Sequence, residues 1–370
     1  MIYLDHAATT PLRKEAFKAM LPYLMEQAAN ANALYGEGRR ARAAIDRARQ
    51  QVADAICAQT EEIYFTGGGS ESDNWALFGI MRVIEEKKHI VTTQIEHHAI
   101  LNACSALEKF GYEVTYVPVD RFGHVSPREI ERAMRPETGM VSVMMANNEV
   151  GTLQPIPEIA KIAHAHGALM HTDAVQAVGH IPVDVNELDV DLLSMAAHKF
   201  YGPKGIGALY IKNKVKITNL IYGGEQERGL RAGTENTPSI VGMGEALKLA
   251  CMEMKESSLQ TARLRDLLES EILKRIPRAI VNGDPANRLP GTLHMTFPGA
   301  DTNMLLMRMD MEGIAVSAGS ACAAGARERS HVLEAMRVPE GADIRFSLGT
   351  ENNDMQIRQT VEVLCRILNG

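Results

Sequence analysis

The sequence predicts an α/β fold: a large domain with a mostly parallel sheet covered by helices, followed by a smaller C-terminal α/β domain. Up to about residue 215, short apolar runs alternate with segments of helical periodicity, a pattern typical of strands joined by covering helices. After about residue 255, a long amphipathic helix precedes a second group of strand-like and helical segments. With 370 residues, 45% of them hydrophobic, the chain is long enough for two domains.

The apolar runs of the first part have the length of buried strands, and two intervening segments, 39–56 and 156–167, have helical spacing. We expect the large domain to comprise residues 15–250. Its expected strands lie within residues 62–69, 89–94, 112–119, 140–149, 168–174, 192–197 and 206–211.

The second part begins with the amphipathic helix expected at residues 258–276. Together with the N-terminal residues 1–14, residues 251–370 are expected to form the small domain. The further strands expected there are 291–297, 314–319 and 343–349, and the further helices are 302–313 and 354–369.

Composition excludes several classes of protein. The formal net charge of -7 argues against binding to nucleic acid or to an anionic membrane. No apolar run approaches the length of a membrane span, and the N-terminus lacks the pattern of a secretion signal, so we expect a cytoplasmic protein. The five cysteines are widely spaced without a Cys-x-x-Cys pair, which predicts neither a disulfide framework nor a metal site.

A glycine-rich turn provides the first candidate site. Residues 65–80 are expected to run from a strand through Gly67, Gly68 and Gly69 into a helix that starts near Ser70. Free N–H groups at a helix start attract phosphate, and glycines allow close approach of the backbone. The same residues are also compatible with an ordinary N-capped helix after a tight turn.

Lys199 is the central candidate for catalysis. The segment SMAAHKFYGPKGIGALY brings it to the end of an expected strand and follows it with a turn rich in Gly and Pro. Partial burial beside His198 would disfavour the charged amine, which could then form a Schiff base with an aldehyde. Pyridoxal 5′-phosphate is an aldehyde that also needs an acid at its ring nitrogen and a phosphate site, which Asp173 and Ser70 would supply. Taken singly, a surface lysine and a helix-capping aspartate are the alternatives.

Other polar residues follow neighbouring expected strands. His97 could stack on the cofactor ring, whereas adjacent His97 and His98 do not share a face and are a poor metal pair. The side-chain amide of Asn147 or Asn148 could donate a hydrogen bond to the phenolic oxygen of the cofactor.

Cys322 lies in a run of Ala, Gly and Ser, between an expected strand and a helix that Ser330 could cap. Small neighbours leave its thiol unhindered, which favours a reactive role. The remaining cysteines are expected to be small buried hydrophobic residues: Cys57, Cys104, Cys251 and Cys365.

In combination, these motifs resemble those of the class V (fold type I) pyridoxal-phosphate enzymes, and within them the cysteine desulfurases of the NifS/IscS-like type. The resemblance spans nearly the whole chain. It is carried, in order, by YLDHAATTP, GGSESDN, EHHA, NNEVG, TDAVQAVG, AHKFYGPKGIGALY, ERGLRAGTENT, SAGSACAAG, SHVL and IRFSLG.

The resemblance implies a fold type I enzyme that takes sulfur from L-cysteine, leaves L-alanine and forms a persulfide on Cys322. It implies a homodimer, and a sulfur-acceptor protein such as an iron–sulfur scaffold, with tRNA or cofactor thiolation as other destinations. The implied catalytic residues are Cys322, Lys199 and His97. The implied cofactor-binding residues are Lys199, Asp173, Gln176, His97, Gly69, Ser70, Asn148, His198 and Thr234, the last reaching the phosphate of the other subunit. The implied substrate-binding residues are Arg345, Asn148 and Asn30.

Departures from the family pattern bear on affinity more than on the reaction. Ala196 stands where the family usually has Ser or Thr, so one phosphate hydroxyl is missing and the cofactor is expected to bind less tightly. Ala31 replaces a proline beside Asn30, and Glu225 stands where a third glycine is common. Three alternatives remain: a selenocysteine lyase, a class V aminotransferase, and a cofactor-binding scaffold without activity.

Overall fold

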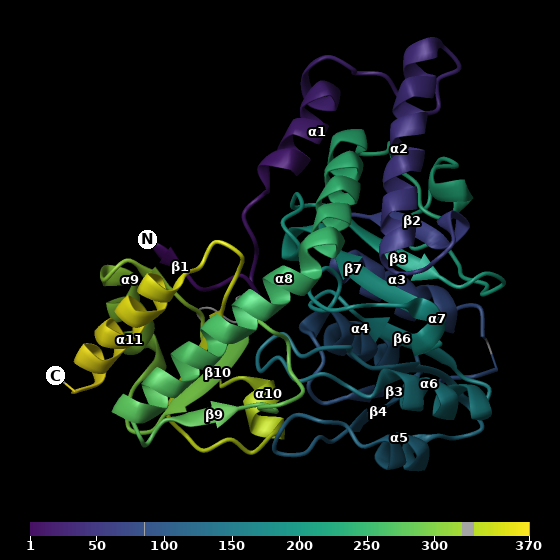
Figure 1. Cartoon of the computed structure of the whole chain (residues 1–370). Helices are drawn as coiled ribbons and strands as arrows, with labels where there is room; N and C mark the ends of the chain where they lie inside the picture. Colours follow the sequence, from purple (N-terminus) through teal and green to yellow (C-terminus); the bar gives the residue numbers. More distant parts are fainter. Residues whose placement is uncertain (85, 320–328, 370) are drawn as a thin grey trace.

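The computed structural model describes residues 1–84, 86–319 and 329–369 (Figure 1). A seven-stranded sheet forms the larger part, as predicted. Of its seven strands, β8 runs in the direction opposite to that of the other six. The strands, in spatial order, are β2 (Ile63–Thr66), β8 (Gly207–Ile211), β7 (Leu192–Ala196), β6 (Leu169–Asp173), β5 (Thr138–Ser142), β3 (His89–Thr93) and β4 (Glu113–Val117).

Both faces of this sheet are covered, which explains the continuous apolar runs of its strands. Adjacent strand residues point to opposite faces and therefore join different cores. Leu192 packs with the helices α3 (Gly69–Met81) and α4 (His98–Lys109), whereas Leu193 packs with α2 (Gly36–Ala55) and α6 (Ile156–Ala165). The other short helices of this part are α5 (Pro127–Ala133), α7 (Val185–Leu188), η1 (Thr60–Glu62), η2 (Ala197–Lys199) and η3 (Glu227–Gly229).

The smaller part has a sheet and a hydrophobic cluster of its own. Its antiparallel strands lie in the order β12 (Ala342–Ser347), β10 (Thr292–Phe297) and β9 (Ile280–Asn282). The N-terminal strand β1 (Ile2–Tyr3) pairs in parallel with β11 (Ile314–Ala315), so both ends of the chain lie on this side (Figure 1). Its helices are α9 (Thr302–Met311), α10 (His331–Ala335) and α11 (Asp354–Asn369).

Two elements here differ from the sequence-based expectation. Strand β9 was not expected, because three residues are too few to show periodicity. The strand expected at residues 314–319 is confined to Ile314–Ala315, since Ser317 and Gly319 form a side-chain turn instead.

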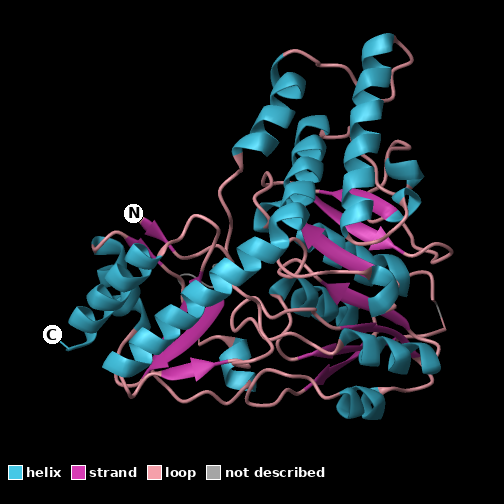
Figure 2. Cartoon of the chain, in the orientation of Figure 1, coloured by secondary structure: helices cyan, strands magenta, loops and turns pink. Residues whose placement is uncertain are grey.

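Helix α8 (Thr237–Arg275) connects the two parts and runs from beside α1 and α2 into the smaller part (Figures 1 and 2). It was expected to start only at residue 258, but it runs for 39 residues. Its first half buries Met243 and Leu247 in the core of the larger part, next to α1 (Lys14–Met25) and α2, and its second half buries Leu264 and Leu268 in that of the smaller part. Tertiary contacts at both ends therefore stabilise a helix that is only weakly amphipathic over its full length.

The expected domain boundary between residues 250 and 251 falls inside this continuous helix, and the division into residues 15–250 and the remainder stays a prediction. Among the helices described in this structure, we found none long and apolar enough to cross a membrane.

A buried ion pair joins the segment around η3, which leads to Thr234, to helix α2 of the larger part. The guanidinium of Arg49, on α2, donates from Nη1 and Nη2 to the two carboxylate oxygens of Glu227, at 2.7 and 2.8 Å. The same carboxylate accepts a hydrogen bond from the backbone N–H of Phe65. Both side chains are buried, so each charge depends on the other for compensation.

We predict that Arg49→Ala lowers the free energy of unfolding by about 3–5 kcal/mol, because it leaves Glu227 buried without its counter-charge. Denaturant titration followed by circular dichroism measures this change. Arg263→Ala is the matched control, since Arg263 pairs with Asp354 at the surface and its loss should leave the unfolding midpoint unchanged. Equal effects of the two substitutions would contradict the role assigned to the buried pair.

Candidate active site

The carboxyl ends of four neighbouring parallel strands bring the main candidate residues to one edge of the sheet. Asp173 is the last residue of β6, and Lys199 ends the short helix η2 that follows β7. His97 follows β3, and Asn148 follows β5. His97 and Lys199 both interact electrostatically with Asp173, so the three side chains lie near one another.

Burial raises the pKa of Asp173, and His97 and Lys199 oppose this shift. One of its carboxylate oxygens, Oδ1, accepts a hydrogen bond from the backbone N–H of Val175 at 2.9 Å. A cationic N–H group beside this carboxylate would stabilise its ionised form. The site is therefore suited to a ligand that presents a protonated ring nitrogen.

His97 is held as a neutral imidazole. It is the N-cap residue of α4, and its Nδ1 accepts a hydrogen bond from the backbone N–H of Ala99 at 3.1 Å. Since Nδ1 is an acceptor, the single proton of the neutral ring lies on Nε2. Burial lowers the pKa of His97, and Asp173 partly opposes this effect. The ring can therefore exchange a proton through Nε2.

The N-terminal segment forms a wall of the site around Lys199. The Lys199 ammonium donates to the backbone carbonyls of Ala7 and Ala8 at 2.6 and 2.8 Å. The side-chain amide of Gln176 donates to the same Ala7 carbonyl at 3.0 Å. On the other side, His180 Nε2 donates to the backbone carbonyl of Lys199 at 2.8 Å. Both the amine and the main chain of Lys199 are thus tied to fixed groups.

The glycine-rich turn lines a cavity with features of an anion site. Helix α3 starts at Gly69 without a side-chain cap, which leaves its first N–H groups available to a ligand. A Cβ atom at Gly69 would lie 2.7 Å from Val175 Cγ2, so only glycine fits this close approach. The cavity is lined by Thr9, Gly67, Gly68, Gly69, Ser70, Glu71, His198, Lys204, Gly205 and Ile206.

His198, within this cavity, has a pKa lowered to about 4, mainly by burial and also by the positive charges of Lys199 and Lys204. Its Nδ1 lies 3.2 Å from the hydroxyl of Thr9. The neutral ring offers one N–H to a ligand oxygen, and Lys204 adds a positive charge at the rim. A phosphate group therefore fits this cavity, where the charge of Lys199 also reaches His198.

Arg345, on β12, is buried beside the residues of the larger part. Its Nη1 donates to the backbone carbonyl of Asn148 at 2.7 Å, and its Nη2 donates to Asp5 Oδ1 at 2.8 Å. Within the described chain, its Nε is buried without a hydrogen-bond partner. A buried guanidinium with unused hydrogen-bonding capacity suits a carboxylate ligand.

Two candidate residues lie away from this group. Asn30 belongs to an exposed segment, where its Oδ1 accepts a hydrogen bond from the backbone N–H of Asn32. Asn32 in turn donates to Glu235 at 3.2 Å, next to Thr234. Thr234 borders a separate small cavity that also contains Gly67 and Gly205. The structure therefore brings Asn30 and Thr234 close to each other, on the outer side of the glycine-rich turn.

Cys322 lies outside the residues that the structure describes. The capping role expected of Ser330 is confirmed, because its hydroxyl accepts hydrogen bonds from the backbone N–H groups of Val332 and Leu333. Among the other cysteines, the expectation of burial is confirmed for Cys104 and wrong for Cys57, which is exposed in the turn after α2 at a positive φ of 58°.

Several residues of the site were not singled out from the sequence. Asp5 and Thr9 come from the N-terminal segment, and Lys204 from the turn after Lys199. Lys204 could have been identified from the sequence, because it is a second basic residue in the turn that follows Lys199. No pattern in the sequence links Asp5 or Thr9 to partners so far along the chain.

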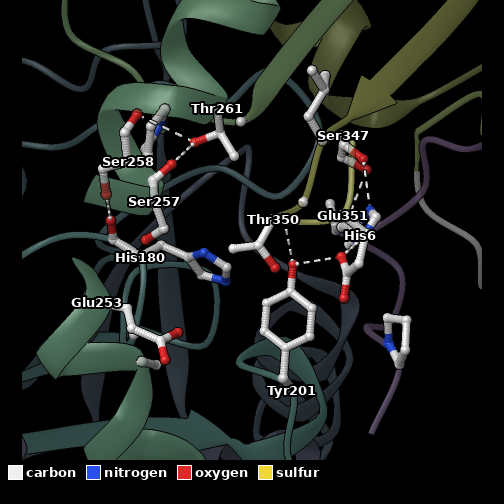
Figure 3. Close-up of a pocket in the computed structure, with 18 of the residues that line it drawn as sticks. His6, His180, Tyr201, Glu253, Ser257, Ser258, Thr261, Ser347, Thr350 and Glu351 are labelled. Atoms are coloured by element: carbon white, nitrogen blue, oxygen red, sulfur yellow. Dashed lines mark hydrogen bonds and ion pairs between the residues drawn. The ribbon is translucent and has the colours of Figure 1, made fainter. Parts of the chain in front are cut away.

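A further cavity, of about 400 Å³, lies between the N-terminal segment, α8 and the turn after β12 (Figure 3). It shares Gln176 and His180 with the surroundings of Lys199. The side chain of Tyr201 extends into this cavity. Its hydroxyl accepts a hydrogen bond from the backbone N–H of Thr350 and lies 3.3 Å from Glu351 Oε2. These contacts join the wall behind Lys199 to the smaller part of the molecule.

Comparison with known proteins agrees with this geometry. A family model described as aminotransferase class-V matches residues 2–359. Over 371 residues the chain is 49% identical to the cysteine desulfurase IscS of Dictyoglomus turgidum, covering 99% of this chain and 94% of that protein. It is 48% identical to the cysteine desulfurase IscS of Methanosarcina thermophila, covering 99% and 92% respectively. A solved structure of a NifS-like protein matches with a TM-score of 0.94 at 37% identity, covering 100% of this chain and 99% of that chain. The chain belongs to the class-V aminotransferase family and, within it, to the cysteine desulfurases, which use pyridoxal phosphate.

Proposed function

We propose that this protein converts L-cysteine into L-alanine and transfers the sulfur to Cys322, using pyridoxal phosphate. The observation that carries the proposal is the meeting of Lys199, Asp173 and His97 beside an anion-binding turn, in a chain nearly half identical to cysteine desulfurases. Overall, L-cysteine and the thiol of Cys322 give L-alanine and a persulfide, so no external oxidant or reductant is consumed in this half of the reaction.

Bound pyridoxal phosphate would supply an aldehyde that reacts with amines and a ring that accepts the electron pair left at the substrate Cα. The residues that would hold it fit this group. Lys199 would offer the amine, Asp173 would pair with the ring nitrogen, Gln176 and Asn148 would bind the ring substituents, and His97 would pack on the ring. The phosphate would be held by Gly69, Ser70 and His198, and by Thr234 of a second subunit.

Lys199 and His97 would move the protons of the reaction. Once its amine is free of the cofactor, Lys199 Nζ can take the proton from the substrate Cα, because its carbonyl partners Ala7 and Ala8 hold it at the site as an oriented base. His97 can exchange a second proton through Nε2, the nitrogen that its capping bond leaves protonated. Asp173 would hold its negative charge against the ring nitrogen throughout.

Arg345 would bind the substrate carboxylate, assisted by Asn148 and Asn30. Its guanidinium is already oriented by Asp5 and by the backbone of Asn148, which lowers the entropic cost of binding a second carboxylate. Asp5 accepts a hydrogen bond from the same guanidinium. The substrate carboxylate would therefore replace part of the hydrogen bonding between Arg345 and Asp5.

The thiolate of Cys322 would attack the sulfur of the substrate. A bond forms between the two sulfur atoms while the substrate Cβ–S bond breaks, and the electron pair of that bond stays on Cβ. Cβ then takes a proton, and L-alanine leaves. The persulfide sulfur would pass to a sulfur-acceptor protein, such as an iron–sulfur scaffold, or to an enzyme of tRNA or cofactor thiolation. A cytoplasmic location stays a prediction.

An exposed apolar surface supports the proposed homodimer. Four apolar side chains of α1 are exposed, and four more are exposed in residues 34–35 and 221–222. These are Phe17, Leu21, Leu24, Met25, Leu34, Tyr35, Ile221 and Tyr222. Exposed apolar side chains mark association sites when they gather in a patch, and residues 221–222 lie in the same stretch between β8 and α8 as Thr234.

We predict that Cys322→Ala abolishes sulfide release from L-cysteine in the presence of dithiothreitol, yet leaves the yellow cofactor bound. Visible absorption measures the cofactor, and alanine and sulfide are measured in the same sample. Lys199→Ala is the reference for a lost cofactor linkage. Sulfide release that survives in Cys322→Ala would refute the proposed nucleophile. A keto acid product would instead indicate an aminotransferase, and faster turnover of selenocysteine a selenocysteine lyase.

Ala196 is buried at the end of β7, with its Cβ 3.5 Å from the position that a Cβ of Gly69 would occupy. We predict that Ala196→Ser lowers the Kd for pyridoxal phosphate about tenfold, because a hydrogen bond to a charged group contributes about 1.5 kcal/mol or more. Titration of the apoprotein, followed by absorbance, measures the Kd. The isosteric pair Ala196→Thr and Ala196→Val separates the hydroxyl from the added volume, and equal affinities of that pair would contradict the prediction.

We predict that Leu24→Glu converts the dimer into monomers at micromolar concentration, because dimerisation would bury the new charge. Sedimentation velocity measures the oligomeric state. Met355→Glu is the control, since Met355 is also an exposed apolar residue, but on α11, away from α1. Monomers of the unaltered protein, or a dimer that tolerates Leu24→Glu, would refute the proposed interface.

A further inference from the structure

Glu149 is a buried carboxylate that the proposed reaction does not use. It follows Asn148 after strand β5, and its side chain is almost inaccessible to solvent. Its backbone N–H donates to Asn147 Oδ1 at 2.9 Å, which fixes the main chain at this point. Burial raises the pKa of Glu149, while a hydrogen bond from Ser330 and the charges of Arg345 and His98 oppose this shift. A carboxylate is costly to bury, so its contacts require an explanation.

One of these contacts is with Ser330. The Ser330 hydroxyl donates to Glu149 Oε2 at 2.5 Å and accepts from the backbone N–H groups at the start of α10. Its single proton and its lone pairs are therefore both used. Neighbouring residues hold the same point, since Arg329 pairs with Asp343 and His331 donates to the backbone carbonyl of Glu96.

The second contact is with Gly319. A Cβ atom there would lie 2.6 Å from Glu149 Oε2 and 3.0 Å from its Cδ, so the glycine backbone packs directly on the carboxylate. Gly319 has a φ of 143°, which side chains rarely tolerate. Just before it, Ser317 exchanges backbone hydrogen bonds with Arg345, the proposed carboxylate-binding residue.

Glu149 thus contacts one described residue on each side of the segment containing Cys322. In the sequence, Cys322 comes three residues after Gly319 and eight before Ser330. The two flanks meet at one carboxylate, beside the guanidinium of Arg345. Because the flanks are also fixed by their own neighbours, loss of this carboxylate would release their mutual contact and leave the rest of the fold in place.

We propose that Glu149 is a positioning residue that ties Gly319 to Ser330, and that this contact sets the rate at which Cys322 takes sulfur from the substrate. The inference rests on the proposed function, because it needs Cys322 as the nucleophile. Small displacements of a reacting group cost large factors in rate, about 100-fold for 1 Å. The effect of Glu149 should therefore appear in the sulfur-transfer step, after substrate has bound and lost its Cα proton.

The test compares the holoenzyme forms of the unaltered protein, Glu149→Ala, Glu149→Gln and Cys322→Ala. Rapid mixing with L-cysteine gives two rates: the cofactor absorbance change, which reports steps before sulfur transfer, and alanine formation in a single turnover. Mass spectrometry of Cys322 follows the gain of one sulfur atom. For Glu149→Ala we expect alanine and persulfide formation to slow by about 10- to 100-fold, with the absorbance change and its dependence on L-cysteine concentration unaltered. Glu149→Gln should recover most of the rate, because its amide oxygen can still accept from Ser330.

Gly319→Ala provides a second route if Glu149→Ala does not fold. The added methyl group would push the flank away from Glu149 without removing a charge, and it should slow the same step. A wild-type rate of alanine formation in either folded variant would overturn the inference. It would also be overturned if the absorbance change slowed as much as alanine formation. Alanine formation by Cys322→Ala at the wild-type rate would instead refute the proposed function, and the role of Glu149 with it.

Discussion

The parallel register of strands β3, β5, β6 and β7 is the constraint on which the rest of the site depends. Parallel strands end at a common edge, so residues far apart in the chain meet where each strand stops. Asp173 and Lys199 are separated in the sequence by a whole crossover, yet they interact because their strands are neighbours. Since both faces of the sheet are covered, this edge lies in a desolvated environment that shifts the pKa values of His97, Asp173 and His198.

The N-terminal segment completes the site by closing it from the opposite side. Its backbone carbonyls at Ala7 and Ala8 bind Lys199, and Thr10 exchanges hydrogen bonds with the backbone of His198 and Tyr201. Asp5 reaches Arg345 in the smaller part of the molecule. One short segment therefore contacts Lys199, His198 and Arg345, and it joins the site residues of the two parts of the molecule.

The smaller part of the molecule supplies the site with a charged side chain more than with residues that enclose it. Arg345 is buried against the backbone of Asn148, and Glu149 lies next in the chain with its carboxylate against Gly319 and Ser330. Asn148 and Glu149 are adjacent residues after β5 in the larger part. Through them, the same short segment contacts both the proposed substrate-binding Arg345 and the residues on either side of the proposed nucleophile. Helix α8, packed into both cores, maintains the relation between the two parts.

Sequence alone indicated the α/β class and the succession of strands along the chain, and it singled out Lys199, Asp173 and His97 as candidates, because apolar periodicity and residue type are local properties. Its motifs also sufficed to indicate the family. Tertiary structure decided the partners: Asp5 for Arg345, Thr9 for His198, Ser330 for Glu149, and the full length of α8. Such pairings depend on how distant segments pack, and packing energy between residues hundreds of positions apart leaves no periodic trace in the chain.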